Sequence, residues 1–253
     1  VGSEMCIRDS PLIDRLEPTA HQSFRPFMPL VGWFVGALGA LVFILANAVF
    51  HHTAIAVVLS IAATILLTGA LHEDGLADSC DAFGGHVTRD RALTIMKDSR
   101  VGTYGMGGLV LVLLFKYLTL SSIAQNSPTW LFIIIYIGAH ALSRSLAIRT
   151  SWRLRYAPLS SDSKSEVAVS YYLTQQDKVI CVCLGLAPVV VLASIDIWLA
   201  FGAVALAVFA SWRMQSLSQQ RIQGYTGDVL GAIQQVSELG FYLGALAFMV
   251  PTA

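Results

Sequence analysis

The sequence predicts an all-α, polytopic membrane helix bundle with about seven transmembrane helices. Hydrophobic residues make up 55% of the 253-residue chain and charged residues only 13%, whereas about a quarter of the residues in a soluble domain are charged. Apolar stretches of roughly 20 residues, the length that crosses a hydrocarbon core of about 30 Å, recur along the chain. The net charge is zero, which gives no reason to expect nucleic acid as a partner.

The apolar stretches define the elements in chain order. The predicted spans are residues 29–50, 54–71, 103–122, 130–150, 178–195, 197–214 and 237–253. The first two spans are separated by only a few residues, as are the fifth and sixth, so each pair is predicted to form a hairpin. The last span is barely long enough to cross the membrane. Residues 24–253 are expected to form a single membrane domain.

Residues 1–23 are expected to be a separate N-terminal segment. This segment contains several charged residues and lacks the apolar stretch of a secretory signal peptide. Its first ten residues have neither helical periodicity nor an initial methionine, which indicates a fragment end or a sequence artefact. We expect no functional role for them.

Lys and Arg residues gather in the predicted loops of one side. Before the first span and in the loops after the second and fourth spans they are Arg8, Arg15, Arg25, Arg89, Arg91, Lys97, Arg100, Arg153, Arg155, Lys164 and Lys178. Arg144 and Arg149, near the inner end of the fourth span, and Arg213 and Arg221, near or after the end of the sixth, are assigned to the same side, which leaves only Lys116 toward the opposite face. Because cytoplasmic loops are enriched in Lys and Arg, the N-terminus and these loops are predicted to be cytoplasmic.

A charged, glycine-containing segment lies between the second and third predicted spans, from His72 to Gly102. Within it, Asp74, Asp78 and Asp81 are spaced i, i+4, i+7 and are predicted to share one face of a helix. Three neighbouring anions repel each other unless a cation neutralises them. Hard carboxylate oxygens suit Mg²⁺ or Mn²⁺, so the spacing predicts a divalent metal site on the cytoplasmic side.

The second half of this segment mixes acidic and basic side chains. Asp90, Arg91, Lys97, Asp98 and Arg100 follow the three aspartates. Such a mixture is typical of a site that handles both metal and phosphate oxygens. The spacing by itself therefore favours a metal-dependent transferase acting on a phosphorylated substrate at the cytoplasmic face.

Further polar residues lie beside or within predicted spans. Thr226 or Asp228 is expected to cap a helix, and Asp228, Gln235 and Glu238 fall on one face of that helix. A plain capped helix is the alternative interpretation for Thr226. Arg144 lies inside the fourth predicted span, where an arginine normally faces a partner or a polar cavity, so it is a candidate site residue.

The segment from His72 to Gly105 resembles the signature of the cobalamin synthase family, the adenosylcobinamide-GDP ribazoletransferases. That signature is H-x-D-G-L-A-D-x-x-D-G, then an arginine, then a basic residue followed by D-S-x-x-G. The matching residues are His72, Asp74, Gly75, Leu76, Ala77, Asp78, Asp81, Arg91, Lys97, Asp98, Ser99 and Gly102. Thr226-Gly227-Asp228 with Gly231-Ala232 and Pro29-Leu30-Val31-Gly32 with Gly36 resemble two other blocks of the family. Ala82 departs from the pattern, which generally has glycine there.

The resemblance implies a reaction and its partners. The cobinamide phosphoryl group of adenosylcobinamide-GDP would pass to α-ribazole or its 5′-phosphate, with release of GMP, in the last steps of cobalamin biosynthesis. The enzyme would lie in a prokaryotic cytoplasmic (inner) membrane, in contact with the lipid bilayer and without nucleic acid. An oligomer is compatible with this interpretation.

The resemblance also implies roles for individual residues. Mg²⁺, or Mn²⁺ in its place, would be held by Asp74, Asp78, Asp81 and Asp98. The catalytic residues would be His72, Asp78, Lys97 and Asp98, with His72 or an aspartate accepting the hydroxyl proton. The substrate-binding residues would be Arg91, Arg100, Arg144, Thr226, Asp228 and Glu238. For His72, an ordinary role as a polar residue at a helix end is an equal alternative.

Two other functions fit parts of the pattern. A CDP-alcohol phosphotransferase also uses aspartates on adjacent helices, but its D-x-x-D-G-x-x-A-R order is not reproduced, because no arginine follows Ala82 at that distance. A transporter would place charges near mid-membrane on broken helices. The charges here are predicted to cluster at one face, which favours the transferase.

Overall fold

The computed structural model describes residues 24–157 and 173–249, and within these ranges every named element is a helix. In chain order they are a 3₁₀ turn (Arg25–Phe27), α3 (Met28–Phe50), α4 (Thr53–Thr68), α5 (Leu71–Gly84), α6 (Arg89–Met96), α7 (Thr103–Asn126), α8 (Thr129–Ser151), α10 (Gln175–Ile195), α11 (Ile197–Ile222) and α12 (Gly227–Phe248). The all-α prediction is confirmed. The predicted N-terminal segment and the last four residues of the predicted seventh span lie outside the described residues.

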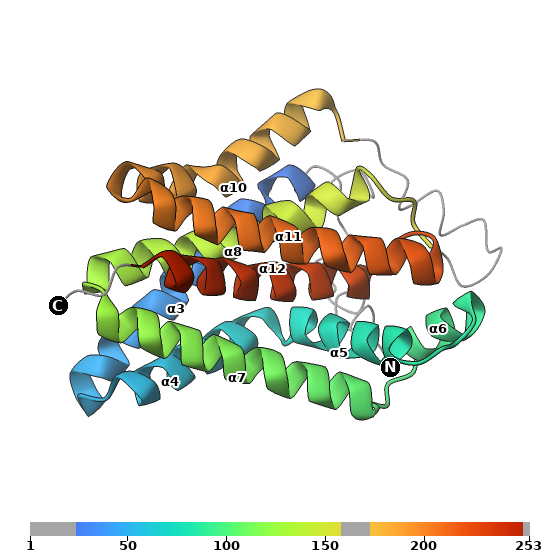
Figure 1. The fold of residues 1–253 in the computed structure, drawn as a ribbon, viewed down its shortest axis with the longest axis horizontal. Helices are drawn as coiled ribbons and strands as arrows, with labels where there is room; N and C mark the ends of the chain where they lie inside the picture. The colour runs from blue at the N-terminus through green and yellow to red at the C-terminus, as the bar shows by residue number, and fades with distance from the viewer. Residues whose placement is uncertain (1–23, 158–172, 250–253) are drawn as a thin grey trace, which may run out of the picture.

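Helix α12 lies in the middle of the bundle, packed along α11 and against α5, α8 and α7 on its other sides (Figure 1). Small residues permit the close contact with α11. A Cβ atom on Gly240 would lie 2.8 Å from the Leu206 carbonyl oxygen, and one on Gly244 would meet the Gly202 carbonyl oxygen. Because α12 is enclosed by protein, its polar side chains face other helices.

In the described part of the chain, five helices are long and apolar enough to cross a membrane individually: Arg25–Phe50, α7, α8, α10 and α11. Helices α4 and α5 are long and apolar enough to cross a membrane only when they are taken together. The pair is bent by 89° between the two helices and would give a sixth span. Helix α12 is not among them, because polar residues interrupt its apolar sequence. The structure thus has five or six candidate spans where the sequence predicts about seven.

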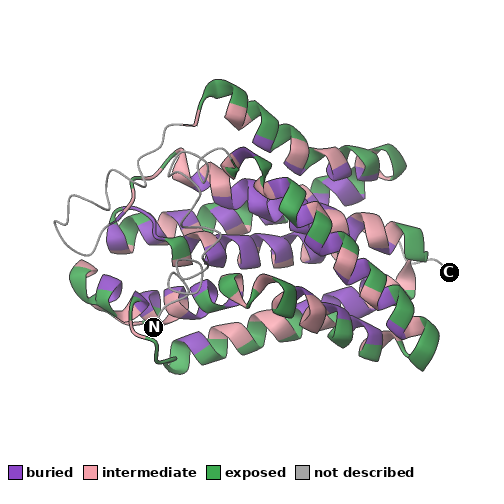
Figure 2. Cartoon of the chain, turned by 180° about the vertical axis from the view of Figure 1, so that it is seen from behind, coloured by how far each residue is buried: buried purple, intermediate pink, exposed green. Residues whose placement is uncertain are grey.

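The outer surface of the bundle is apolar. Exposed residues follow the outward faces of the helices and buried residues follow the inward faces (Figure 2). Large hydrophobic side chains such as Phe34, Leu45 and Val190 are exposed. An apolar surface of this extent is expected to contact lipid.

The boundary between α4 and α5 is a sharp break. Gly69 and Ala70 both adopt left-handed backbone conformations, with φ of 61° and 57°, a region that favours glycine. The predicted span 54–71 therefore ends early, at Thr68. After the break, α5 runs along the start of α12, where a Cβ on Gly231 would lie 3.2 Å from the Cα of His72.

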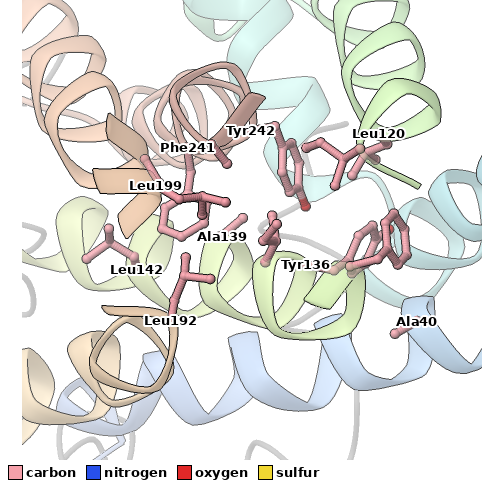
Figure 3. Close-up of a cluster of buried hydrophobic side chains, with 14 of the residues drawn as sticks. Ala40, Leu120, Tyr136, Ala139, Leu142, Leu192, Leu199, Phe241 and Tyr242 are labelled. Atoms are coloured by element: carbon pink, nitrogen blue, oxygen red, sulfur yellow. The ribbon is translucent and has the colours of Figure 1, made fainter. Parts of the chain in front are cut away.

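Aromatic and aliphatic residues of several helices form the main core (Figure 3). Phe132 and Tyr136 of α8 and Phe43 of α3 form a series of tilted ring contacts, with ring centroids 4.3 Å apart for Phe43 and Phe132 and 5.5 Å apart for Phe132 and Tyr136. Tyr242 of α12 lies 6.0 Å from Tyr136, in a stacked arrangement. Such aromatic contacts add to the stability gained by burial alone.

A second core joins α5 and α6 to α11 and α12. It contains Phe83, Leu93, Met96, Ile222 and Val229, all buried. This core fixes the predicted charged segment against the end of the bundle, so the segment is folded as α5 and α6 and not as a free loop.

Two boundaries differ from the predictions because polar turns continue the helices. Helix α11 runs to Ile222, beyond the predicted end at residue 214. Helix α12 starts at Gly227, directly after the predicted cap at Thr226, and it continues without a break through residue 237, where the seventh span is predicted to begin. In both cases contacts with neighbouring helices bury polar residues that an apolar pattern does not include.

Candidate active site

The aspartates of α5 meet the start of α12. Asp74, Asp78 and Asp81 lie on one continuous helix, as the spacing predicts. Gly75 lets α12 approach closely, because a Cβ there would lie 2.7 Å from the Asp228 carbonyl oxygen. The negative charges of Asp74, Asp228 and Asp81 all act on Asp78. These four residues form what we call the carboxylate cluster.

Asp81 also has a structural role. Its Oδ2 accepts a hydrogen bond from the Gly102 amide at 2.7 Å, and its Oδ1 accepts one from the Gly105 amide at 2.8 Å. A side chain thus binds the otherwise unpaired amide groups at the start of α7. Asp81 connects α5 to α7 and holds the preceding loop at the edge of the carboxylate cluster.

The basic loop is exposed and internally paired. The Arg100 guanidinium donates from Nε to Asp98 Oδ1 at 2.9 Å and from Nη2 to Asp98 Oδ2 at 2.6 Å. These hydrogen bonds lower the pKa of Asp98 to about 2 and raise the pKa of Arg100. Arg91 and Lys97 are exposed nearby in the chain. Asp98, a predicted metal ligand, therefore binds Arg100 in this structure, while the other three predicted ligands lie in the carboxylate cluster.

Thr226 caps α12. Its hydroxyl oxygen accepts a hydrogen bond from the Val229 amide at 3.3 Å, and the same hydroxyl lies 3.4 Å from Asp228 Oδ2 as a donor. The capping interpretation of Thr226 is confirmed. The cap fixes the first turn of α12 and, with it, the position of Asp228.

Arg144 and Glu238 lie deeper, in a buried polar group. Glu238 Oε1 is 2.8 Å from Lys116 Nζ, and Glu238 Oε2 is 3.2 Å from His140 Nδ1. Arg144 donates to the His140 carbonyl oxygen at 3.0 Å. Gln234 also donates to Glu238. Arg144 and Glu238 are both predicted to bind substrate. In this structure Glu238 instead pairs with a cation of the protein, Lys116.

The buried group continues to α5. Lys116 Nζ donates to Gln235 Oε1 at 2.7 Å, and Gln235 Nε2 donates to Glu73 Oε1 at 2.9 Å. We call the set Glu73, Lys116, His140, Arg144, Gln234, Gln235 and Glu238 the interior network. It draws on α5, α7, α8 and α12.

His72 connects the two parts of the site. It is half-buried at the start of α5, and the charges of Arg144, Glu238 and Lys116 act on it. The next residues along the helix are Glu73, in the interior network, and Asp74, in the carboxylate cluster. His72 is thus placed at the boundary between the network and the cluster.

Several members of the network are not among the predicted site residues. The sequence predicts Lys116 toward the opposite face, but the residue is only 5% exposed and its side chain turns into the bundle. Its position inside an apolar span, like that of Arg144, is a signal that it requires an anionic partner. His140 gives a similar signal, because it also lies inside a predicted apolar span. Glu73 gives none, because it lies in the charged segment and its role depends on which helices pack together.

The donor chemistry of the carboxylate cluster fits a hard divalent cation. Within the described ranges, no three acidic, His or Cys side chains converge to enclose a metal ion. Mg²⁺ commonly uses only one or two carboxylates and completes its coordination with water and substrate phosphates. A site of shared carboxylates that substrate completes is compatible with this arrangement.

The fold and site define a multi-span helical membrane protein with a carboxylate cluster at one end of the bundle and a charged network inside it. A family model described as cobalamin-5-phosphate synthase matches residues 11–246. The chain belongs to this family.

Individual relatives agree with the family match. A protein of Leptothrix cholodnii is 42% identical over 90% of this chain and 85% of its own length. One of Vibrio parahaemolyticus is 40% identical over 92% and 84%, and one of Polaromonas is 41% identical over 92% and 91%. All three are named adenosylcobinamide-GDP ribazoletransferase. No solved structure matches the chain.

The family match decides among the predicted functions. Because the interior network lies within the bundle, the prediction that charges cluster at one face only is incomplete, and it no longer argues against a transporter. Membership of the family favours the transferase over both the CDP-alcohol phosphotransferase and the transporter.

Proposed function

We propose that this protein transfers the cobinamide phosphoryl group of adenosylcobinamide-GDP to α-ribazole or its 5′-phosphate. The products are GMP and adenosylcobalamin or its 5′-phosphate, in cobalamin biosynthesis. The observation that carries this proposal is the family match across residues 11–246, which includes all four residues of the carboxylate cluster.

The carboxylate cluster is proposed to bind Mg²⁺, with Mn²⁺ as a substitute. Asp74, Asp78 and Asp228 would supply the ligands. Asp81 would contribute through the lone pairs of its carboxylate oxygens that do not accept the two amide hydrogen bonds. The ion would neutralise charge on the transferring and leaving phosphate oxygens. The mutual repulsion of the four carboxylates supports this assignment, because a bound cation relieves it.

The exposed loop is proposed to hold the nucleotide diphosphate. Arg91 of α6 and, in the loop that follows, Lys97 and Arg100 would supply the cations, and the Asp81–Gly102 hydrogen bond keeps this loop beside the carboxylate cluster. Guanidinium groups match phosphate oxygens in pairs. For Arg100 to bind phosphate, it would exchange its present partner, Asp98, for the substrate, and Asp98 would become available as a ligand.

His72 or Asp78 is proposed to accept the proton of the attacking hydroxyl. Both belong to α5, at the boundary and the centre of the carboxylate cluster respectively. Arg144 and Glu238 would line the deep end of the site beside His72, and Thr226 would hold Asp228 in place. A base must lie within hydrogen-bonding reach of the hydroxyl, which restricts the acceptor ribazole to the α5 side of the cluster.

The active site is proposed to face the cytoplasm of a prokaryotic cell, with α12 counted as a seventh helix inside the bundle. The end of α5, helix α6, the start of α7 and the start of α12 lie at the same end (Figure 1). That end carries Arg89, Arg91, Lys97 and Arg100. The basic residues support a cytoplasmic orientation, with the N-terminus on the same side.

The test is release of GMP by the purified protein in lipid nanodiscs. The reaction contains adenosylcobinamide-GDP, α-ribazole and Mg²⁺, and the corrinoid product is measured with GMP. We expect both products from the unchanged protein and neither from Asp78→Asn. Asp90→Asn is the matched control, because the Asp90 side chain is 87% exposed on α6 and lies outside the carboxylate cluster. An unchanged protein that releases no GMP would refute the proposed reaction.

A further inference from the structure

Helix α5 has no rigid continuation at its N-terminal side. The left-handed residues Gly69 and Ala70 separate it from α4, at an angle of 89°. Across such a break, the helical hydrogen-bond pattern of α4 does not set the rotation of α5 about its own axis. The rotation matters, because each residue of a helix points about 100° away from the previous one. The aspartate face of α5 reaches Asp228 only in one rotational setting.

The far end of α5 is fixed directly by α7. Asp81 binds the Gly102 and Gly105 amides at 2.7 and 2.8 Å. At the first turn, by contrast, α5 packs closely on the backbone of α12 at His72 and Gly75, and a directional side-chain bond is needed to fix its rotational setting. The first turn contains His72 and Asp74, so its position decides where two proposed site residues lie.

We propose that Glu73, Gln235 and Lys116 form a directional hydrogen-bond relay that positions the first turn of α5. Lys116 is a donor only, so it binds the amide oxygen of Gln235 at 2.7 Å. The Gln235 amide nitrogen is thereby directed to Glu73, at 2.9 Å. Glu73 is an acceptor and completes the relay. These three are positioning residues, and the inference rests on the proposed function only in what it says about catalysis.

Because the three residues of the relay are buried, the Gln235 amide has one favourable orientation. Lys116, Gln235 and Glu73 are 5%, 2% and 8% exposed. A buried amide that faces two donors or two acceptors leaves polar atoms unpaired, at a substantial cost in free energy. Gln234 Oε1 also accepts from Gln235 Nε2 at 2.9 Å, which favours the same orientation of the Gln235 amide.

The network's charges support the same arrangement. Glu238 and Glu73 supply two anions, and Lys116 and Arg144 supply two cations. Glu238 pairs with Lys116 at 2.8 Å, and both Glu238 and Glu73 act electrostatically on Arg144. Glu73 therefore balances charge inside the bundle as well as anchoring α5. Helix α7 thus holds α5 at both ends, directly through Asp81 and indirectly through Lys116 and Gln235.

An exchange of the two side chains tests the relay. In Gln235→Glu, position 235 still accepts from Lys116 but offers no donor to Glu73, so two carboxylates face each other. In the double variant Gln235→Glu with Glu73→Gln, position 73 donates to position 235, and the net charge equals that of the unchanged protein. The hydrogen bond from position 235 to Gln234 is lost in both variants, so the comparison between them isolates the bond to position 73. Substitution of Lys116 is less informative, because it leaves Glu238 buried without its cation and threatens folding.

Hydrogen–deuterium exchange of peptides from α5 reads the position of the helix without using activity. We expect exchange about tenfold faster in Gln235→Glu than in the unchanged protein, in line with loss of a buried hydrogen bond. We expect the double variant to return close to the original rate. Peptides from α10, which lies outside the network, serve as the internal control.

Turnover is measured on the same samples. We expect kcat for GMP release to fall in Gln235→Glu and to recover in the double variant. The relay is overturned if α5 exchanges at the original rate in Gln235→Glu, or if the double variant exchanges as fast as Gln235→Glu. Failure of the unchanged protein to release GMP would refute the proposed function. The relay would then still be tested by the hydrogen–deuterium exchange of α5 alone.

Discussion

Lys116 of α7 and Glu238 of α12 form an ion pair at 2.8 Å, with side chains only 6% and 3% exposed. Two charges withdrawn from water stabilise a protein only if each remains paired, because one isolated charge in the interior is very unfavourable. The pair lies among His140, Gln234 and Gln235, which supply further hydrogen bonds. The ion pair therefore joins α7 to α12 inside the interior network.

Removal of one partner is expected to be more harmful than removal of both. Lys116→Met leaves Glu238 buried and uncompensated, and we expect a loss of about 3–5 kcal/mol in the free energy of unfolding. The double variant Lys116→Met with Glu238→Met should recover most of this loss. Unfolding in detergent micelles measures the effect, and equal losses in the single and double variants would contradict it.

The exposed pair of Asp98 and Arg100 provides the contrast. Both residues lie in a loop before α7, and ion pairs in contact with water contribute little to stability. Asp98→Asn is expected to leave the unfolding midpoint unchanged in the same detergent assay. If the proposed nucleotide site is correct, GMP release by this variant should nevertheless fall. A large loss of stability would show that the loop has a structural role that its exposure does not indicate.

The contact between Gly75 and Asp228 is expected to tolerate no side chain. A Cβ on Gly75 would lie 2.7 Å from the Asp228 carbonyl oxygen, so Gly75→Ala must push α5 away from α12 or strain both. Overpacking of this kind costs about 1–3 kcal/mol, and turnover should fall because the carboxylate cluster is separated.

Gly107→Ala is the matched control for Gly75→Ala. Nothing lies within 4 Å of a Cβ at Gly107, which is inside α7. Alanine favours a helix by about 1 kcal/mol over glycine, so stability should be unchanged or slightly higher, with full turnover. Equal stability and turnover in Gly75→Ala and Gly107→Ala would show that α5 and α12 are not in close contact in the active protein.

Asp81 is expected to affect stability as well as activity. Its carboxylate binds two amides at the start of α7, and loss of a helix cap costs about 1 kcal/mol. Asp81→Ala should lower the unfolding midpoint by a corresponding amount and increase protease cleavage near Gly102. Loss of metal binding with an unchanged midpoint would assign Asp81 to the metal alone.

The proposed orientation is checked at the two ends of α7. Val101→Cys and Gln125→Cys each place a thiol at an exposed position, Val101 just before the start of α7 and Gln125 near its end. Both variants are made in a background without the four native cysteines. A membrane-impermeant thiol reagent added to intact cells should label only Gln125→Cys. Labelling of Val101→Cys from outside would reverse the proposed topology.

The local features of this protein could be predicted from its sequence. Helices and apolar spans follow from composition over about 20 residues, and the aspartate face of α5 follows from the spacing of Asp74, Asp78 and Asp81. The break at Gly69 and Ala70 could not, because an apolar stretch runs through it without a proline or a polar cluster. The predicted second span was therefore too long.

The features that depend on helix pairing were beyond the sequence pattern. Asp228 joins the carboxylate cluster only because Gly75 admits α12, and Lys116 meets Glu238 only because α7 packs against α12. The charges inside apolar stretches signal that partners exist, but they do not say which. The predicted start of the last span at residue 237 falls inside the single helix α12 for the same reason, since the polar residues of this helix are paired with neighbours distant in sequence.

The most direct test of the site is Mn²⁺ binding to the purified protein, followed by electron paramagnetic resonance. The carboxylate cluster predicts that the unchanged protein and Asp90→Asn bind Mn²⁺, that added Mg²⁺ displaces it, and that Asp78→Asn and Asp228→Asn each lose most of the bound signal. Asp228→Asn is the decisive variant, because only the packing of α12 against α5 brings that residue to the cluster. Unchanged Mn²⁺ binding by both Asp78→Asn and Asp228→Asn would contradict the carboxylate cluster as the metal site.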